Sequence, residues 1–251
     1  MKRNLHTHTT YCDGKDPPEA LVLTAIEKGF DTLGFSGHSP LPGAEDWCMS
    51  PAGAAAYRAE IGRLKEQYRG RLTILCGVEQ DIESGRAPAG YDYVIGSVHS
   101  IRKDGALVTV DWTPEHLQAG VEVHWGGDWY AMAEDYYRRV AQVAAVTGAD
   151  IIGHFDLVTK FNEGGTFFDE GHPRYVAAAQ AAALALLEAG KPFEVNTGGI
   201  ARGWRTDAYP AAPLRDFLMR HGARFLLTSD CHMKDQLDCA FDRFAAYAKG
   251  G

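Results

Sequence analysis

The sequence predicts a parallel α/β barrel with seven strands. Short apolar runs alternate with helical segments along the chain, a pattern typical of parallel strands joined by crossover helices. Most of these apolar runs end in His, Glu or Asp, and parallel strands bring their carboxyl ends together at one mouth. Because seven strands are one fewer than usual, we expect a distorted (β/α)7 barrel whose functional site lies at the carboxyl ends of the strands.

Length and composition predict a single domain spanning residues 1–251. The chain is 45% hydrophobic and 23% charged, which suffices for one full core. No apolar run approaches the roughly 18 residues of a membrane helix, and the N-terminus leads into His6 without the apolar region of a signal peptide. The five cysteines are odd in number and lack CxxC spacing, so we expect reduced thiols in a cytoplasmic protein.

The charge balance favours a small substrate. A formal net charge of -8 repels polyanions, which argues against a broad nucleic-acid surface. A few local cations and metal ions could still hold a small phosphorylated molecule. We therefore expect small-molecule chemistry and no membrane partner.

The first two strands are expected close to the N-terminus. The first strand is expected near residues 2–7, and Asp16 is expected to cap a helix that Pro17 starts. Gly29 ends this helix, and the second strand follows at once over residues 32–36.

The middle of the chain contains two further strands and one long irregular segment. A helix over about 54–68 leads to the third strand, 72–78, and the fourth strand, 91–98, follows after an unusually short connection. Residues 101–128 match no periodic pattern, so we expect a long loop, and loops of this length are often lids or binding elements.

Periodic segments alternate again in the C-terminal part. Gly148 and Gly190 follow two of the helical patterns and serve as stop signals. The expected strands are 150–153, 192–196 and 224–228, and the expected helices are 128–147, 173–189, 212–221 and 234–248.

Two pairs of residues at strand ends have the spacing of metal ligands. His6 and His8 lie two apart on a strand, so their side chains point the same way and can bind one ion. Asp230 and His232 repeat this spacing after the apolar run 225–228. A single HxH pair also fits two polar residues at a strand edge, but the recurrence of the spacing favours metal binding.

Five further residues at or near strand ends are weaker candidates on their own. Glu79 could bridge two cations with its two oxygens, or form an exposed salt bridge. His99 and His154 could each be an ordinary hydrogen-bonded core histidine. His38 is a single signal, and Asp13 could simply form a turn before Gly14.

The number of candidates indicates more than one ion. Nine potential ligands exceed the three or four protein ligands that one zinc ion takes, so we expect two or three divalent metals. Nitrogen and carboxylate ligands favour Zn, Fe or Mn over Mg or Ca. Surface or capping roles are expected for the other histidines, namely His116, His124, His172 and His221.

These strand-end residues resemble the motifs of the polymerase and histidinol phosphatase (PHP) family of metal-dependent phosphoesterases. Segments 153–156, 194–198 and 202–204 are similar to its stand-alone histidinol-phosphatase branch. The residues that carry the resemblance are His6, His8, Asp13, His38, Glu79, His99, His154, Asp230 and His232.

The resemblance implies a (β/α)7 barrel with three divalent metal ions. It implies hydrolysis of L-histidinol phosphate to L-histidinol and phosphate, as in histidine biosynthesis. A hydroxide bridging the Glu79-linked ions would attack phosphorus, and Asp230 or His232 would pass a proton to the departing alkoxide. By family analogy, His6, His8, Glu79 and Asp230 bind one ion, Glu79, His99 and His154 a second, and Asp13, His38 and His232 a third.

Two cations in the late loops could bind phosphate. Lys160 and Arg202 follow the fifth and sixth strands, and Arg can hold two phosphate oxygens at once. A role as ordinary surface cations fits nearly as well, and Arg205 and Arg102 are alternatives.

Three other functions remain open from the sequence. The same metal site could act on a different small phosphate ester or on nucleic-acid ends. An amidohydrolase-type enzyme also begins with HxH, but it normally has eight strands and a single late Asp. A non-catalytic metal-binding module is disfavoured because no member of the ligand set is missing.

Overall fold

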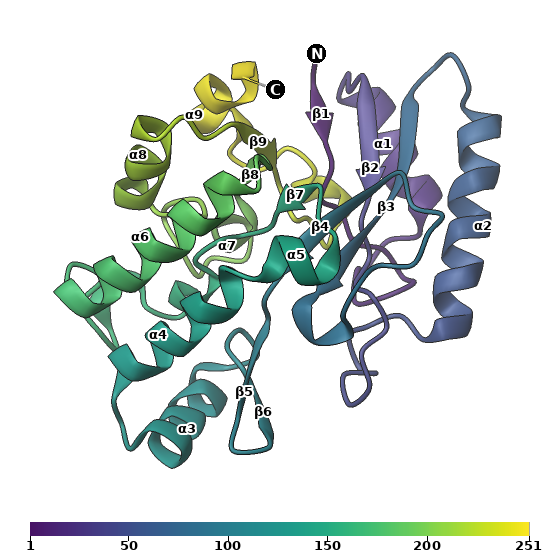
Figure 1. Ribbon diagram of the computed structural model, residues 1–251. Coiled ribbons are helices and arrows are strands. Elements are labelled where there is room, and N and C mark those ends of the chain that lie inside the picture. The colour runs from purple at the N-terminus through teal and green to yellow at the C-terminus, as the bar shows by residue number, and fades with distance from the viewer. Residues whose placement is uncertain (251) are drawn as a thin grey trace.

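The computed structural model describes residues 1–250 and contains a parallel sheet of seven strands. Figure 1 shows the strands at the centre and helices outside them. The order of the strands in the sheet is β1, β2, β3, β4, β7, β8, β9. Their bounds are β1 Arg3–Asn4, β2 Thr32–Phe35, β3 Thr73–Asp81, β4 Tyr93–Ser97, β7 Ile151–Ile152, β8 Phe193–Asn196 and β9 Phe225–Thr228.

The first and last strands come together and nearly close the sheet into a barrel. Thr7 and Cys231 form an isolated parallel bridge, and the His8 amide donates a 2.9 Å hydrogen bond to the Cys231 carbonyl. All sheet pairings in this ring are parallel. The predicted distorted (β/α)7 barrel is therefore confirmed, and the seven predicted strands all form.

Helices surround the barrel and supply a large part of the hydrophobic core. Two begin with side-chain caps: the Ser50 side chain accepts from the Gly53 amide, and Asp128 accepts from the Tyr130 and Ala131 amides. None of the helices within residues 1–250 has the length and apolar character required to cross a membrane. The outer helices are α1 Pro18–Glu27, α2 Pro51–Gln67, α4 Trp129–Val140, α5 Val143–Thr147, α6 Pro173–Glu188 and α8 Ala212–Arg220.

A separate apolar cluster fills the interior of the barrel. Tyr93, Ile95, Ile151 and Leu226 come from three different strands and pack with one another. The Tyr93 hydroxyl also donates to the Leu5 carbonyl. These side chains close the barrel below the strand ends, so polar groups at those ends face a single open mouth.

Residues 101–128 are ordered into regular elements, so the prediction of an irregular loop is wrong. An antiparallel hairpin joins β5 Ser100–Lys103 to β6 Ala106–Thr109, and α3 Pro114–Trp125 follows. The hairpin turns at Asp104 and Gly105, which both have positive φ. Each strand of the hairpin has only four residues, too few to show a period, although the Asp-Gly pair is a recognised hairpin signal.

Three predicted helix boundaries differ from the structure. Pro17 is the N-cap residue of α1, and the Asp16 carboxylate accepts from the Lys234 amide instead. The expected helix 128–147 is divided between α4 and α5. The expected helix 234–248 is broken, because Ala240 has a φ of 56°; its pieces are η4 Lys234–Gln236, α9 Phe241–Phe244 and η5 Ala245–Gly250.

Candidate metal centre

Glu79 lies at the centre of the strand-end cluster. One carboxylate oxygen, Oε2, lies 3.2 Å from His6 Nε2 and 2.9 Å from His38 Nδ1. The other oxygen, Oε1, lies 3.2 Å from His99 Nε2 and 2.8 Å from His154 Nε2. Glu79 is buried near the end of β3, so the alternative of an exposed salt bridge is wrong.

Asp230 adds a second carboxylate beside the two N-terminal histidines. Its Oδ1 lies 3.1 Å from His8 Nε2 and 3.5 Å from His6 Nε2. Asp230 has a φ of 48°, and this turn after β9 brings the carboxylate into the mouth. The i, i+2 pairs from β1 and β9 therefore meet as their spacing predicted.

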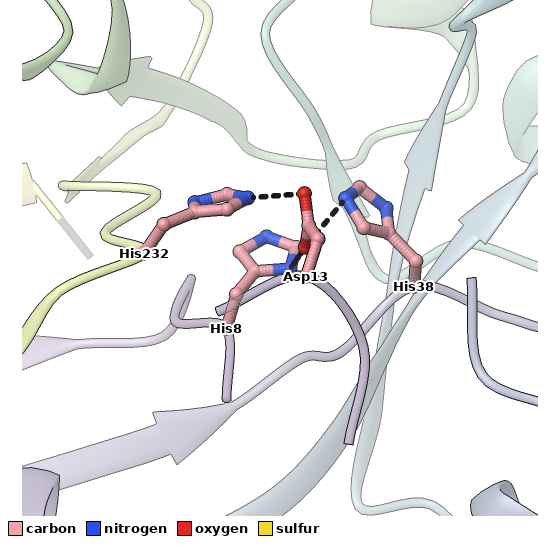
Figure 2. Close-up of side chains that lie close together, drawn as sticks. All are labelled: His8, Asp13, His38 and His232. Carbon is pink, nitrogen blue, oxygen red and sulfur yellow. Dashed lines mark hydrogen bonds and ion pairs between the residues drawn. The ribbon is translucent and has the colours of Figure 1, made fainter. Parts of the chain in front are cut away.

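A third carboxylate, Asp13, lies among three histidines (Figure 2). Asp13 Oδ2 lies 3.0 Å from His232 Nε2. Asp13 Oδ1 lies 3.6 Å from His38 Nε2 and 3.7 Å from His8 Nδ1. The Asp13 side chain is 30% exposed, whereas the histidines beside it are more deeply buried. This group forms the outer part of the cluster.

Several atoms in the cluster are buried and have no hydrogen-bond partner among the described residues. They are His6 Nε2, His8 Nε2, Asp13 Oδ1 and Glu79 Oε2. Leaving such groups unpaired in a protein interior is costly, so they indicate a missing positive ligand. Imidazole nitrogens and carboxylate oxygens are the donors that Zn, Fe and Mn accept, and this set therefore fits divalent metal ions.

The ligand atoms divide into three overlapping groups, each with atoms within 4.8 Å of one another. Asp13, His38 and His232, predicted to bind one ion, are joined by His8 in the structure. The assignment of particular ligands to particular ions stays a prediction. The three groups are His8 with Asp13, His38 and His232; His6 with His8 and Glu79; and His38 with Glu79 and His99.

The buried charges shift one another's proton affinities. Burial opposes a charge on His6, but Glu194, Asp230 and Glu79 outweigh it and raise its pKa. Burial and the neighbouring histidines lower the pKa of His8 to about 3. Burial favours protonated Glu79, but the histidines around it lower its pKa well below the usual value. At neutral pH the centre therefore offers carboxylates and a neutral His8.

The PHP domain family matches residues 4–198 of the chain. The chain belongs to the PHP family. A Deinococcus radiodurans protein named "Probable histidinol-phosphatase" is 31% identical over 94% of this chain and 88% of its own length. The histidinol-phosphatase of Bacillus subtilis is 26% identical over 97% of this chain and 98% of its own length.

Two solved structures share the fold of this PHP domain. A Listeria monocytogenes protein assigned as a histidinol phosphatase has a TM-score of 0.84 and 21% identity, covering 97% of this chain and 100% of its own. The Lactococcus lactis histidinol phosphate phosphatase, complexed with Zn, L-histidinol and phosphate, has a TM-score of 0.62 and 21% identity over 93% of this chain and 87% of its own. At this identity the likeness shows the fold.

Two acidic residues that sequence reasoning missed support histidines of the cluster on the side of the ring away from Glu79. Glu194 Oε1 lies 2.7 Å from His6 Nδ1, and Asp81 Oδ2 lies 2.9 Å from His99 Nδ1. Each carboxylate accepts a hydrogen bond from Nδ1 of the ring, so that Nε2 faces Glu79. The signal for Glu194 was a charge between Phe193 and Val195 in an apolar strand.

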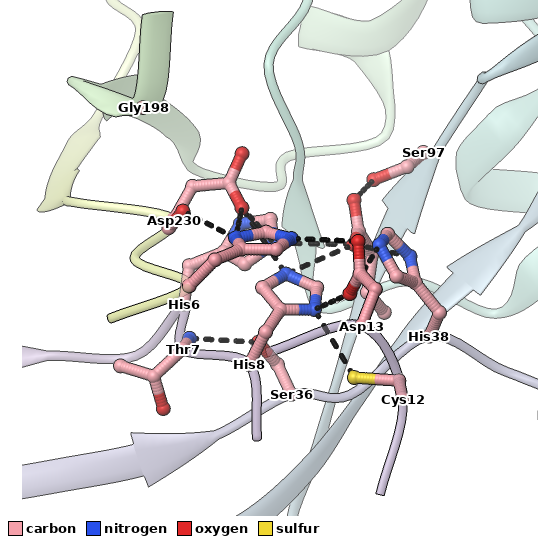
Figure 3. A network of polar contacts seen from close by, with 12 residues as sticks. His6, Thr7, His8, Cys12, Asp13, Ser36, His38, Ser97, Gly198 and Asp230 are labelled. Carbon is pink, nitrogen blue, oxygen red and sulfur yellow. Dashed lines mark hydrogen bonds and ion pairs between the residues drawn. The ribbon is translucent and has the colours of Figure 1, made fainter. Parts of the chain in front are cut away.

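Smaller polar groups complete the support of the site (Figure 3). The Ser97 hydroxyl donates a 2.7 Å hydrogen bond to Glu79 Oε1. Cys12 Sγ lies 3.5 Å from His8 Nδ1, and its thiol donates to the Thr9 carbonyl. Burial and Asp13 raise the pKa of Cys12, which keeps the sulfur protonated and disfavours it as a metal ligand.

Both predicted phosphate-binding cations line the same cavity of about 880 Å³ as the metal cluster. Arg202 Nη2 lies 2.7 Å from His232 Nδ1 and 3.7 Å from Asp230 Oδ1. Lys160 Nζ donates a 2.6 Å hydrogen bond to the Asp111 carbonyl. The two fallback candidates lie outside this lining.

Those fallback cations have acidic partners elsewhere. Arg205 donates to the Thr159 carbonyl and to Glu170, each at 2.9 Å. Arg102 donates to Glu83 at 3.0 Å on the protein surface. Neither guanidinium faces the metal cluster, so Lys160 and Arg202 remain the better candidates for phosphate binding.

Proposed function

We propose that this PHP domain is a metal-dependent phosphatase that hydrolyses L-histidinol phosphate to L-histidinol and phosphate. The cluster of six histidines and three carboxylates carries this proposal, because its unpaired donor atoms face one another at the mouth of the barrel. The two curated relatives match this chain over nearly its whole length and bear the name of this activity. That agreement in length supports the same activity here.

The nine strand-end residues would hold the ions, and we keep the three-ion assignment as part of the proposal. When bound, divalent ions lower the pKa of water, hold phosphate oxygens and offset the charge of the transition state. Glu79 Oε2 faces His38 and Oε1 faces His154, so its carboxylate could coordinate two ions at once. Zn, Fe and Mn all suit this donor set.

Side chains of the cavity would bind and orient the phosphate. Arg202 presents a planar fork that can donate two parallel hydrogen bonds to phosphate oxygens, and Lys160 adds a point charge. Asp230 or His232 would pass a proton to the departing alkoxide oxygen. Burial and Arg202 lower the pKa of His232, so its neutral imidazole would first accept a proton from the attacking water and then pass that proton to the alkoxide.

A phosphate-release assay tests this function. The purified protein, loaded separately with Zn, Mn or Fe, is incubated with histidinol phosphate, other small phosphomonoesters, single-stranded DNA and an amide substrate. We expect the highest kcat/KM with histidinol phosphate, and metal analysis of the active protein gives the number of ions. Comparable turnover of all the phosphomonoesters, or cleavage of DNA alone, contradicts the assigned substrate.

A further inference from the structure

Two neighbouring loops at the mouth of the barrel carry the two candidate phosphate-binding cations. Residues 153–172, the β7 loop, follow β7 and include Lys160, and residues 197–211, the β8 loop, follow β8 and include Arg202. β7 and β8 are adjacent in the sheet, and both cations line the metal cavity. Two positive charges in one cavity repel each other, so a fixed separation between them requires contacts between the loops.

Arg205 joins the two loops. Its side chain is only 8% exposed and extends from the β8 loop to acceptors of the β7 loop. Nη1 donates 2.9 Å hydrogen bonds to the Thr159 carbonyl and to Glu170 Oε1, and Nη2 donates to Glu170 Oε2 at 3.4 Å. Nε lies 3.3 Å from Glu163 Oε2. The guanidinium is therefore bound to the β7 loop at several points, and one of them directly precedes Lys160.

Within the β8 loop, Arg205 is firmly connected to Arg202. Arg202 is the C-cap residue of the short helix α7 Gly198–Ala201. The Arg205 amide donates a 3.1 Å hydrogen bond to the Gly199 carbonyl of the same helix. Gly203 has a φ of 73°, which lets the chain turn back between the two arginines. A displacement of Arg205 is therefore transmitted to Arg202.

Charge and aromatic packing support the same junction between the loops. Burial opposes the charge on Arg205, but Glu170 outweighs it and raises the pKa of the guanidinium, which therefore stays charged. Asn162 Nδ2 donates a 3.0 Å hydrogen bond to Glu170 and so fixes the acceptor. The rings of Phe161 and Trp204 meet edge to face across the loops, with centroids 4.8 Å apart. The loops are thus joined by a polar and an aromatic contact.

We propose that Arg205 is a positioning residue for phosphate binding: it holds the two loops so that Lys160 and Arg202 reach the same phosphate. This inference rests on the proposed function, in which these two cations bind the phosphate group. Arg205 is not among the residues that line the cavity, so it acts through the other two. Cations that are held in place before the phosphate arrives lose less conformational entropy on binding, which increases the affinity.

The variant Arg205→Lys removes the planar fork and retains the positive charge. A single ammonium on a flexible stem cannot bind the Thr159 carbonyl and Glu170 in the geometry of the guanidinium. We expect the affinity for inorganic phosphate to fall about tenfold or more, because the two cations are no longer held at one separation. The metal content should stay unchanged, since the guanidinium has its partners in the β7 loop and not in the metal cluster.

Arg174→Lys is the matched control. The Arg174 guanidinium also binds two carboxylates, Glu134 at 2.7 Å and Asp128 at 2.9 Å, but it joins α6 to the start of α4 and does not line the metal cavity. This variant loses a similar fork of hydrogen bonds and should keep the phosphate affinity of the wild type. If Arg205→Lys does not fold, Glu170→Gln takes its place, because it removes the charge that holds Arg205 and keeps the shape of the side chain.

Titration calorimetry of the metal-loaded proteins with inorganic phosphate measures these affinities, and thermal denaturation monitors the fold. A double-mutant cycle with Lys160→Ala separates positioning from general support of the structure. When Lys160 is absent, the separation between two cations no longer matters. We therefore expect Arg205→Lys to reduce phosphate affinity by less than about threefold in the Lys160→Ala background, against about tenfold in the otherwise wild-type protein.

Equal losses in the two backgrounds would show that Arg205 supports the fold in general and would overturn the proposal. Unchanged phosphate affinity in Arg205→Lys, or in Lys160→Ala, overturns it as well. If the wild type hydrolyses other phosphomonoesters but not histidinol phosphate, and the expected coupling is found, the positioning role stands while the proposed substrate fails. Turnover of histidinol phosphate with a phosphate affinity that does not depend on Arg205 gives the opposite conclusion.

Discussion

Glu194 is a buried carboxylate that organises the metal centre without being one of its predicted ligands. Besides His6 Nδ1, it accepts hydrogen bonds from the His154 amide at 3.0 Å and the Asn196 side chain at 3.1 Å. It therefore fixes the ring of one ligand and the backbone of another. Carboxylates in this position also increase the basicity of the coordinating nitrogen.

Replacing Glu194 by Gln should weaken metal binding about tenfold with little change in the fold. The amide carries no charge, so it supports the His6 ring less strongly. Competition with a chromophoric chelator measures the affinity, and circular dichroism monitors the fold. Glu66→Gln is the control, because Glu66 is 69% exposed on α2. An unchanged metal affinity in Glu194→Gln would mean that the ring is held by packing alone.

Metal binding should release protons at neutral pH, and the apparent affinity should rise with pH. Burial opposes charge on His6 and His99, but nearby carboxylates outweigh it and raise the pKa of both. An ion must displace these protons, so acid weakens binding. Titration calorimetry in buffers of different ionisation enthalpy counts the released protons. Heats that do not depend on the buffer would contradict this expectation.

The residues that gather in the cluster were predictable from the sequence, whereas the residues that support them were not. His6 and His8, like Asp230 and His232, lie two residues apart at a strand end, a spacing that fixes their shared direction. Glu194 meets His6 across 188 positions of sequence, and which side of β8 faces that histidine depends on the stagger between strands. Local spacing contains no information on that stagger.

At the scale of elements, the strands and surrounding helices of the barrel were recognised, whereas the insertion between β4 and α4 was not. Asp111 and Trp112 line the cavity from the segment between β6 and α3, and the four-residue strands of the hairpin before them are too short for periodicity to be visible. The last predicted helix, 234–248, has a composition that favours a helix. Its break at Ala240 follows from packing against the rest of the chain, since isolated propensity favours a helix there.

The contact between β3 and β4 inside the barrel should be intolerant of added volume. Gly77 pairs with Tyr93, and a Cβ atom at Gly77 would lie 2.3 Å from the Tyr93 ring. Gly77→Ala must displace this ring, which packs in the barrel interior, so we expect destabilisation of about 1–3 kcal/mol in urea denaturation.

The control for this substitution lies on α2, the helix that precedes β3 in the chain. A Cβ at Gly62 in α2 meets nothing within 4 Å, so Gly62→Ala should leave stability unchanged or raise it slightly. Equal destabilisation by both substitutions would contradict the claim that the interior contact is responsible. Equal tolerance would show that Tyr93 can move freely.

For the whole molecule, metal ions should stabilise the fold by joining distant parts of the chain. His6 and His8 follow β1, while Asp230 and His232 follow β9, and these strands meet at the seam of the barrel. Ions at one hundred times their dissociation constant add about 2.7 kcal/mol per site. Removal with a chelator should therefore lower Tm and abolish phosphatase activity, and added metal should restore both.

Calorimetry of the metal-loaded and chelator-treated protein measures this shift. The variant Asp230→Asn should show a smaller difference in Tm between the two states, because one carboxylate at the seam is lost. His124→Gln, on α3 and away from the cluster, should keep the full difference. A Tm that is insensitive to the chelator while metal leaves the protein would refute the stabilising role.

The seam between β1 and β9 also has a consequence for biosynthesis. His232 is the last member of the cluster to be translated, and it completes a group whose first member is His8. During most of translation, the nascent polypeptide contains His6 and His8 but does not yet contain Asp230 and His232. Truncated translation products that stop short of this residue therefore lack a complete centre.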